Sequence, residues 1–589
     1  MNNQAPAINS SEVISQYEAG EYDKLSEFFL QILMYLGNTR FVELSQQQIK
    51  YINAFIKLFL DIFTRDDFSV NQRYYTRFIN FNPVISNLLC LTQYVTTDVW
   101  LQKLLAQKNN IIKVLTLYSH RNTLKINETQ FFDVNPELAS RWYAFNLKSA
   151  DSYITKTSYE NCIHLINNID HRLAYQGIFS ISAYMRCSYI DPVNDRIYKH
   201  YMNNRIKPIF KNFKINNKPD NRSIAVVTGR WSRNSAVYKS NYKMIEALAD
   251  KYRLTLVKIE IPNSAEIDTA YFNDIKAVRF VNGQLDLKSI LNNDFGLAYF
   301  PDVGMVDISC FLCNARLSPI QVMGYGHPVS TFGSEIDYLI GGQDIENYDD
   351  VESDYTERLI LVPGLGVTPV IPEYVPEDKT ACLRNGDEII INCAWGAHKI
   401  NYPIIQILKQ IAEETGRIIK YQFLQTAILD GCSYIATRKE MQKEFGNINI
   451  FISANNNMEN YMSYLNRGNF AIDSYPFGGY NTIVDNLILG KPVVAWEGQR
   501  SFNRLASGLL RQVGLSELIA SDSTSYIGLI KKLILDNNYR NEITERICNL
   551  DLRNKLIDEN NPVYFRRAID YLLNDNRKRK DSRKPVLIE

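Results

Sequence analysis

The sequence predicts an all-α domain followed by two Rossmann-like α/β domains, on the basis of three observations. The chain has 589 residues, which is too many for one compact domain at about 100 to 200 residues per domain. From about residue 10 to 207 the apolar residues recur three and four positions apart, which is the period of amphipathic helices. After residue 221, short β-branched runs alternate with helical stretches, as in strand–helix units built on a parallel sheet.

The helical part is predicted to span residues 1–210. Turn signals at Gly37-Asn38, Asn82-Pro83, Asn135-Pro136 and Asp191-Pro192 divide it into helix pairs without a fixed repeat. A polar segment at 211–221, which contains Pro219, marks the boundary between the helical part and the α/β part.

Two series of strands define the α/β part. The first series, at 224–228, 254–261, 277–281, 296–300, 320–323 and 338–340, predicts a Rossmann-like domain over residues 221–375. A proline-rich stretch from Pro363 to Pro376 separates it from a second Rossmann-like domain at 380–560, with strands at 388–392, 418–423, 448–452, 470–473 and 492–495. Residues 561–589 are predicted to form a C-terminal helix and a basic tail.

Composition narrows the class of partner and the compartment. With 65 basic and 64 acidic residues the formal charge is +1, so no general attraction for nucleic acid or anionic membranes is expected. Residues 1–18 lack the pattern of a secretory signal, and no apolar run reaches the roughly 20 residues of a membrane span. The nine scattered cysteines do not form a disulfide scaffold. A cytoplasmic location is therefore predicted.

No metal site or bound cofactor is expected. Cys310 and Cys313 form one Cys-x-x-Cys pair, but a second pair or a nearby histidine to complete a zinc site is missing from the sequence. Two small apolar residues on one helix face are the favoured explanation of this pair, ahead of metal or redox use. The sequence also lacks Asp-x-Asp, the carboxylate pair that commonly holds a divalent ion on a sugar nucleotide.

The loop after strand 470–473 carries the most informative pattern. It contains two glycines that let a backbone approach an anion closely, and then the start of a helix, whose amides attract negative charge. The predicted diphosphate cradle consists of Gly478, Gly479, Tyr480, Asn481 and Thr482. An ordinary strand-to-helix turn is the alternative.

Asp485 and Lys399 are the charged candidates of the second α/β domain. Asp485 lies about one turn into the helix, where its carboxylate could accept hydrogen bonds from ribose hydroxyls; an acidic residue that merely favours the helix start is the alternative. Lys399 follows strand 388–392 and is a candidate phosphate ligand, or else a solvated surface lysine.

The first α/β domain contributes two further candidates. The loop at 228–235, which holds Asn234, follows the first strand and is not the dinucleotide Gly-x-Gly-x-x-Gly pattern. His327 lies in a glycine-rich turn at 324–328 and is a candidate base or ligand, with a structural histidine as the alternative.

Three segments together resemble glycosyltransferase family 41: residues 314–331, the Lys399 loop, and the run DSYPFGGYNTIVD at 473–485. The sequence is most similar to the cytoplasmic bacterial N-glycosyltransferases of this family, which attach glucose from UDP-glucose to Asn in Asn-x-Ser/Thr sequons of adhesins. Protein O-GlcNAc transferase is a more distant relative, which residues 490–494 and 504–520 resemble. The resemblance covers about residues 220–540 and, more weakly, the helical half, which in this family is an acceptor-side domain.

The resemblance implies a GT-B fold. It also implies an inverting, metal-independent transfer of a hexose from a UDP-sugar to a protein acceptor, with glucose as the expected hexose. The acceptor would be Asn in a sequon of an adhesin or another surface protein before export. Two alternatives remain open: the same donor chemistry with a Ser/Thr hydroxyl or a saccharide acceptor, and a non-catalytic helical scaffold that only binds a nucleotide.

By resemblance, Lys399 matches the family's diphosphate lysine, Asn481 an Asn at the phosphates, and Asp485 the ribose aspartate. Two positions depart from the family pattern. A histidine near the acceptor face is replaced by Asn234, and a phosphate-side histidine in the loop after Ile452 is replaced by Asn455. Asn cannot act as a general base at neutral pH. The predicted catalytic residues are therefore Lys399, Asn234 and His327, with Asn455 added to the donor-binding set.

Overall fold

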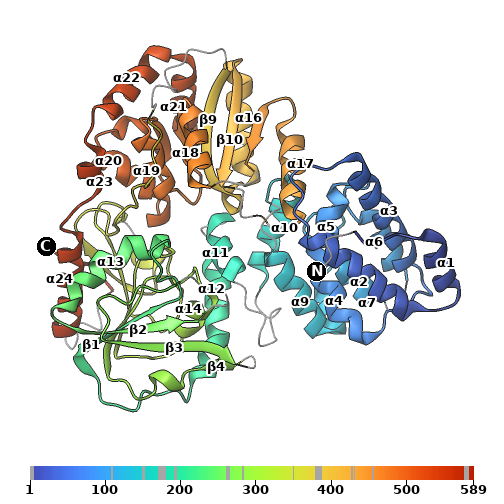
Figure 1. Cartoon of the computed structure of the whole chain (residues 1–589), viewed down its shortest axis with the longest axis horizontal. Coiled ribbons are helices and arrows are strands. Elements are labelled where there is room, and N and C mark those ends of the chain that lie inside the picture. The colour runs from blue at the N-terminus through green and yellow to red at the C-terminus, as the bar shows by residue number, and fades with distance from the viewer. Residues whose placement is uncertain are drawn as a thin grey trace. The chain divides into compact units, whose positions relative to one another are not determined.

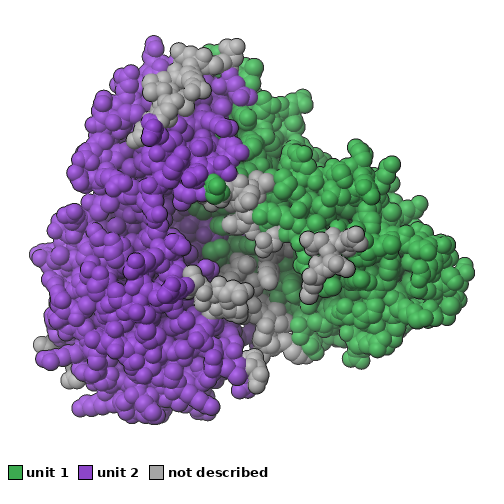
Figure 2. All heavy atoms as spheres, in the orientation of Figure 1, with its two compact units in different colours: residues 1–186, 394–457 green, residues 187–393, 458–589 purple. Residues whose placement is uncertain are grey.

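The computed structural model describes residues 5–107, 110–148, 153–169, 181–190, 195–260, 266–281, 284–348, 351–377, 388–425, 429, 431–453, 457–575 and 583–589. The chain divides into two compact units, coloured separately in Figure 2. The first unit combines residues 1–186 with 394–457, and the second combines 187–393 with 458–589.

The regular elements that the structure describes before residue 210 are all helices, as the apolar spacing predicts (Figure 1). Helix α3 shows how such a helix starts, because the side chains of Ser45 and Gln48 form a reciprocal capping box at its first turn. The helices are α1 Ser10–Glu18, α2 Tyr22–Asn38, α3 Gln46–Phe63, α4 Tyr75–Asn80, α5 Asn82–Cys90, α6 Asp98–Leu105, α7 Ile111–Leu117, α8 Thr129–Val134, α9 Pro136–Lys148, α10 Lys156–Asn167, α11 Ile181–Ile190 and α12 Asp195–Ile206.

The first unit is held together by an aromatic core and by one buried ion pair. Phe59 and Phe63 stack with ring centroids 4.8 Å apart. Arg121, which follows α7, donates two hydrogen bonds to Glu440 of α17 Ser433–Phe445, from Nε at 2.7 Å and from Nη2 at 3.0 Å. Its Nη1 donates to Asn87 of α5 at 2.7 Å, so the guanidinium joins three elements.

Replacing Glu440 with alanine is expected to lower the free energy of unfolding of the first unit by about 3 kcal/mol. The Arg121 side chain is only 5% exposed, and it would keep its charge without a carboxylate partner. Urea denaturation followed by tryptophan fluorescence measures the change, with the exposed Glu413→Ala on α16 Tyr402–Thr415 as control. Equal unfolding midpoints for the two variants would contradict this prediction.

A nine-stranded sheet forms the first α/β layer of the second unit, in the order β15-β8-β7-β6-β5-β1-β2-β3-β4. Its paired strands are parallel except for β3 and β4. The strands are β1 Asp220–Thr228, β2 Arg253–Ile259, β3 Asp274–Val281, β4 Gln284–Asp286, β5 Phe295–Phe300, β6 Ile320–Met323, β7 Tyr338–Gly342, β8 Arg358–Val362 and β15 Val586–Leu587. All six strands of the first predicted series are present, and β4, β8 and β15 were not predicted.

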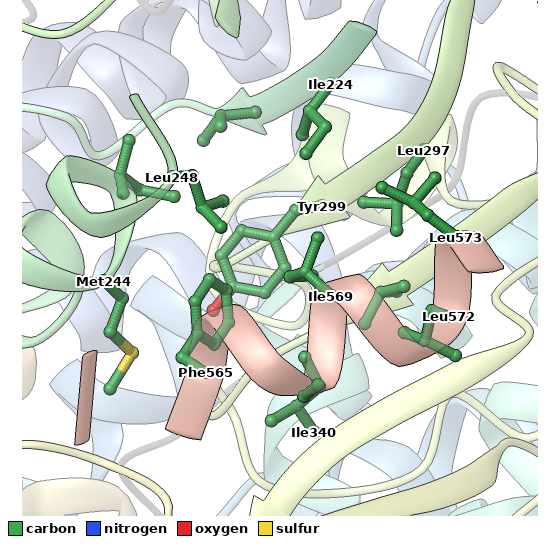
Figure 3. Packing of buried hydrophobic residues seen from close by; sticks show 14 of the residues in the cluster. Ile224, Met244, Leu248, Leu297, Tyr299, Ile340, Phe565, Ile569, Leu572 and Leu573 are labelled. Carbon is green, nitrogen blue, oxygen red and sulfur yellow. The ribbon is translucent and has the colours of Figure 1, made fainter. Parts of the chain in front are cut away.

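The end of the chain completes this layer. Helix α24 Asn561–Asp575 places Phe565, Ile569 and Leu572 in one buried cluster with Leu297 and Tyr299 of β5 (Figure 3). Beyond it, β15 pairs with β8. The basic stretch 576–582 of the predicted tail lies outside the described residues.

A six-stranded sheet forms the second α/β layer, in the order β11-β10-β9-β12-β13-β14. The strands are β9 Glu388–Gly396, β10 Ile418–Gln425, β11 Asn449–Ile452, β12 Phe470–Ile472, β13 Val493–Trp496 and β14 Ile519–Ala520. The helices between β11 and α24 are α18 Met458–Arg467, α19 Asn481–Ile488, α20 Leu505–Gln512, α21 Ser523–Leu535, α22 Asn537–Cys548 and α23 Leu552–Leu556. The predicted pair of parallel α/β sheets is therefore confirmed. Among the described helices, none has the length and apolarity needed to cross a membrane.

Candidate functional site

The loop between β12 and α19 is shaped by a buried aspartate. Asp473, only 2% exposed, follows β12, and its Oδ1 accepts hydrogen bonds from the main-chain amides of Ser474 at 2.8 Å and Gly479 at 2.6 Å. The amide of Gly478 donates to the carbonyl of Phe502 at 3.0 Å. The loop therefore folds back on the end of strand β12. The main-chain amides of Gly478 and Gly479 both donate hydrogen bonds within the protein.

The two glycines are required by this tight path. A Cβ on Gly478 would lie 2.8 Å from Asp473 Oδ2, and one on Gly479 would lie 2.7 Å from Thr482 Oγ1. Both distances are shorter than side-chain carbons tolerate. Because both glycines lack a Cβ, the side chains of Asp473 and Thr482 can lie close to the loop backbone. Close approach of a ligand to the same backbone remains a prediction.

Three amides of the predicted cradle lie at the start of α19. The main-chain amides of Tyr480, Asn481 and Thr482 have no hydrogen-bond acceptor among the residues that the structure describes. They stand at the N-terminus of an eight-residue helix, where the helix dipole attracts negative charge. This arrangement can accept the oxygens of a phosphate or diphosphate.

Two side chains of the cradle are tied to the segment after β8. The hydroxyl of Tyr480 donates to the carbonyl of Val367 at 2.8 Å, and Asn481 Oδ1 accepts from the amide of Val370 at 3.0 Å. Because its oxygen is engaged, the Asn481 amide group offers its NH₂ as the remaining donor. A donor is the group that phosphate oxygens require.

Asp485 is half-buried and has one partner that the sequence analysis missed. Tyr461 of α18 donates from its hydroxyl to Asp485 Oδ2 at 3.0 Å. Burial raises the pKa of Asp485 to about 7, so the carboxyl group is partly protonated at neutral pH. A pair of ribose hydroxyls could supply the hydrogen bonds that stabilise its charged form.

The remaining donor-side candidates belong to the first unit. Lys399 ends the short helix η5 Ala397–Lys399, directly after β9, and is half-buried. Burial lowers the pKa of the adjacent His398 to about 3, with a smaller effect of Lys399, so this imidazole is neutral. Asn455 lies outside the described residues.

His327 lies directly beside the loop, whereas Asn234 is exposed. The His327 ring, 3% exposed, stacks on Phe477 with an interplanar angle of 1° and centroids 5.4 Å apart. Asn234 lies between β1 and α13 Ala236–Ala249. The turns that carry these two residues both come after the carboxyl ends of strands in the same parallel sheet, the edge where such sheets bind ligands.

Asp302, a further buried carboxyl group, fixes the loop that leads to Asn234. It follows β5, and its Oδ2 accepts from Thr228 Oγ1 and from the amide of Gly229, both at 2.8 Å. Burial raises its pKa, and the hydrogen bonds from Ser309 and Thr228 oppose that rise. An aspartate just after a fully apolar strand was the available sequence signal, and it was missed.

Cys310 and Cys313 lie buried on and just after α14 Asp307–Leu312. Cys313 Sγ donates to the Cys310 carbonyl at 3.2 Å, and burial raises the pKa of Cys313 to about 12. Within the described ranges, no group of three or more His, Cys, Asp or Glu residues could hold a metal ion. The pair packs as small buried thiols, and metal-independent chemistry stays a prediction.

Comparison with known proteins assigns the region that carries this loop. Residues 384–564 match the family model described as Glycosyl transferase family 41. These residues form a family 41 glycosyltransferase domain. The domain includes Lys399, the cradle and Asp485, and the predicted resemblance and enzyme class are thereby confirmed.

Relatives that are named for their activities extend the match beyond the family 41 domain. The chain is 23% identical over 480 residues to the "UDP-glucose:protein N-beta-glucosyltransferase" of Actinobacillus pleuropneumoniae serotype 5b (strain L20), covering 77% of this chain and 74% of that protein. It is 24% identical over 249 residues to a "Probable UDP-N-acetylglucosamine--peptide N-acetylglucosaminyltransferase SPINDLY" of Hordeum vulgare, covering 41% of this chain and 26% of that one.

A solved structure shows the same fold. A variant of the O-GlcNAc transferase of Thermobaculum terrenum superposes with a TM-score of 0.56 at 16% identity, covering 90% of this chain and 98% of that chain. Together with the two parallel sheets, this confirms the predicted helical domain and GT-B architecture. The roles of the individual site residues remain predictions.

Proposed function

We propose that this family 41 protein transfers glucose from UDP-glucose to an asparagine side chain of a protein acceptor. The observation that carries the proposal is the start of α19, where three amides with no acceptor in the described part of the chain lie one turn from the Asp485 carboxyl. The Actinobacillus pleuropneumoniae relative, named for UDP-glucose and protein N-glucosylation, supports the choice of donor and acceptor.

The diphosphate and the ribose of the donor each have a matching group in the proposed complex. The diphosphate accepts hydrogen bonds from the amides of Tyr480, Asn481 and Thr482 and from the Asn481 NH₂, and the ribose hydroxyls bind Asp485. Lys399 supplies a compact positive charge to the leaving UDP. Such preorganised donors stabilise the negative charge that grows in the transition state more strongly than they stabilise the ground state.

The proposed reaction inverts the anomeric centre. The acceptor nitrogen attacks the anomeric carbon, the bond from that carbon to the UDP oxygen breaks, and the nitrogen loses one proton. Asn234 cannot remove that proton at neutral pH, so its proposed role is to hydrogen-bond the acceptor. His327, with Phe477 stacked on its ring, is the candidate base in this proposal.

A transfer assay tests the proposal. The protein is incubated with UDP-glucose and a peptide that contains one Asn-x-Thr sequon, and mass spectrometry locates any added hexose. The expected result is one hexose on Asn and none on the matched peptide with Gln in its place. Hexose on the Thr hydroxyl, or on a saccharide acceptor alone, would replace asparagine as the acceptor. Binding of UDP-glucose without any transfer would reduce the protein to a nucleotide-binding scaffold.

The affinity for UDP-glucose is expected to rise about tenfold between pH 6 and pH 8. With a pKa of about 7 for Asp485, about one tenth of the molecules carry the carboxylate at pH 6 and about nine tenths at pH 8. Ribose hydroxyls donate to the charged form, so deprotonation favours binding. Isothermal titration calorimetry at both pH values measures the change.

Asp485→Asn is the control for this pH dependence, because its amide does not titrate and keeps a similar shape. Its affinity should be low and nearly equal at both pH values. A wild-type affinity that stays constant across this range would show that Asp485 does not contact the donor.

The rate of transfer is expected to be unchanged after EDTA treatment. In the proposed complex Lys399 and the helix amides, rather than a divalent ion, stabilise the negative charge of the diphosphate. Initial rates with EDTA, and with added manganese or magnesium after EDTA, provide the measurement. A rate that is lost with the chelator and restored by either ion would contradict metal independence.

We further propose that the acceptor is an adhesin or another surface protein that is modified in the cytoplasm before export. The buried thiols of Cys310 and Cys313 support a reducing compartment. Recovery of a hexose-modified surface protein from producing cells, and its absence after deletion of this chain, is the expected result.

A further inference from the structure

Glu346 is a buried carboxyl group whose hydrogen bonds join the two α/β layers of the second unit. It lies four residues after β7. Its Oε1 accepts from the hydroxyls of Tyr325 and Tyr355, both at 2.9 Å, and its Oε2 accepts from Tyr355 at 3.1 Å. The hydroxyls of Tyr355 and Ser501 lie 2.7 Å apart. Two tyrosines of the first layer are thereby connected to a serine of the second layer.

The partners of this carboxyl group in the described part of the chain are hydroxyls. Burial raises the pKa of Glu346 to about 7, and hydrogen bonds from Tyr325, Tyr355 and Ser501 oppose that rise. Gly341 on β7 leaves room for the network, since a Cβ there would lie 2.4 Å from the Tyr325 hydroxyl oxygen. A neutral glutamine would be less costly to bury than an ionised carboxyl group. The carboxylate at this position therefore indicates a role beyond packing.

The network ends beside two rings that both stack on Phe477 of the cradle loop. The His327 ring lies parallel to Phe477 at 5.4 Å, and the Phe502 ring lies at 4.9 Å with an angle of 10°. Tyr325 stands two residues before His327, and Ser501 directly precedes Phe502 in the short helix η7 Ser501–Asn503. One carboxyl group thus fixes the chain next to both ring partners of Phe477.

This stack is continuous with the cradle. The carbonyl of Phe502 accepts the hydrogen bond from the Gly478 amide at 3.0 Å. Only Gly479 separates Gly478 from Tyr480, the first of the three amides at the start of α19. A shift of Phe502 would therefore move the loop and the amides together. Groups that bind a ligand depend on such supporting contacts for their position.

We propose that Glu346 is a positioning residue that holds both ring partners of Phe477 in place and so sets the conformation of the cradle loop. The arm through Tyr355 and Ser501 supports donor binding, and the arm through Tyr325 supports the turn that carries the candidate base. Glu346 itself touches neither donor nor acceptor. The inference rests on the proposed function, in which this loop binds UDP-glucose.

Calorimetric titration of the full chain with UDP-glucose, without any acceptor, tests the proposal. Glu346→Ala is expected to weaken donor binding about tenfold, because the buried hydroxyls lose their acceptor and rearrange. Glu346→Gln keeps one acceptor oxygen and should lose less affinity. Circular dichroism establishes folding, and if the alanine variant does not fold, the glutamine and tyrosine variants decide. Wild-type affinity in every folded Glu346 variant would overturn the proposal.

The two arms should affect different kinetic parameters. Tyr355→Phe is expected to weaken UDP-glucose binding about tenfold with a smaller effect on kcat, and Tyr325→Phe to lower kcat about tenfold with nearly unchanged affinity. Tyr252→Phe is the matched control, because its buried hydroxyl donates to the Asp570 carboxylate directly before β2, at the opposite ends of the strands. Equal losses of affinity in Tyr355→Phe and Tyr252→Phe would overturn the proposal.

A double-mutant cycle separates positioning through Ser501 from a general loss of stability. In a Ser501→Ala background the arm is already broken, so adding Glu346→Gln should cost little further affinity. Losses that simply add would overturn the proposal.

The same measurements distinguish this inference from the proposed function. Wild-type protein that binds UDP-glucose without transferring glucose would refute the proposed function, and the affinities of Tyr355→Phe and Glu346→Gln would still decide the role of Glu346. Transfer by the wild type, together with unchanged affinity in all Glu346 variants, would refute only the positioning role.

Discussion

Replacing Lys399 with alanine is expected to lower kcat by a factor of about 10² to 10³, which is about 3 to 4 kcal/mol of transition-state stabilisation. Negative charge on the UDP β-phosphate grows as the glycosidic bond breaks, so a fixed ammonium gains energy along the reaction. His398 next to it is neutral because burial lowers its pKa to about 3, and therefore cannot replace the lost charge. The affinity for UDP-glucose should change less than kcat does.

Steady-state kinetics beside a circular-dichroism check of folding measures this effect. Lys399→Arg should recover little activity, because a planar fork places its donors differently from a compact ammonium. Lys443→Ala, at an exposed position of α17, is the matched control. A near-normal kcat in folded Lys399→Ala would move the phosphate contact elsewhere, with the loop at 228–235 as the next candidate.

Replacing Asp473 with alanine is expected to weaken UDP-glucose binding about 100-fold, or about 2.7 kcal/mol. Its carboxylate oxygen accepts from the buried amides of Ser474 and Gly479, and each amide left without an acceptor costs about 1 to 3 kcal/mol. The loop would rearrange to satisfy them. The amides at the start of α19 would then no longer lie where the diphosphate binds.

Calorimetry with UDP-glucose measures the loss, and thermal denaturation establishes that the variant is folded. Asp473→Asn keeps an acceptor oxygen and should lose less affinity than the alanine variant. The exposed Asp250→Ala, just after α13, is the control. Wild-type affinity in folded Asp473→Ala would show that the loop conformation does not determine donor binding.

Local sequence patterns were sufficient to predict the architecture. A buried parallel strand appears as a short β-branched run, and a helix as apolar residues three and four apart, so both can be recognised without their partners. The helical half, six strands of the first sheet and five of the second were predicted in this way. The double glycine before a helix start also identified the cradle loop, because both features are contiguous in the sequence.

Features that depend on distant partners were decided by the tertiary structure. β15 has only two residues and forms because β8 provides an edge to pair with, more than 220 residues away in sequence. Neither its length nor its composition distinguishes it from a tail. Likewise, α24 was predicted as a helix, but only the structure shows that it covers the core around Tyr299.

In the candidate site, too, local sequence patterns predicted some features and the tertiary structure decided others. The sequence alone determined which residue types stand at the cradle, at Asp485 and at Lys399, and their family resemblance. Only the tertiary structure showed that Asp473 uses the Gly479 amide, that Tyr461 holds Asp485, and that His327 is stacked under Phe477. The physical reason is that hydrogen bonds and burial depend on which atoms are in contact in the folded chain. A linear pattern of residue types does not specify those contacts.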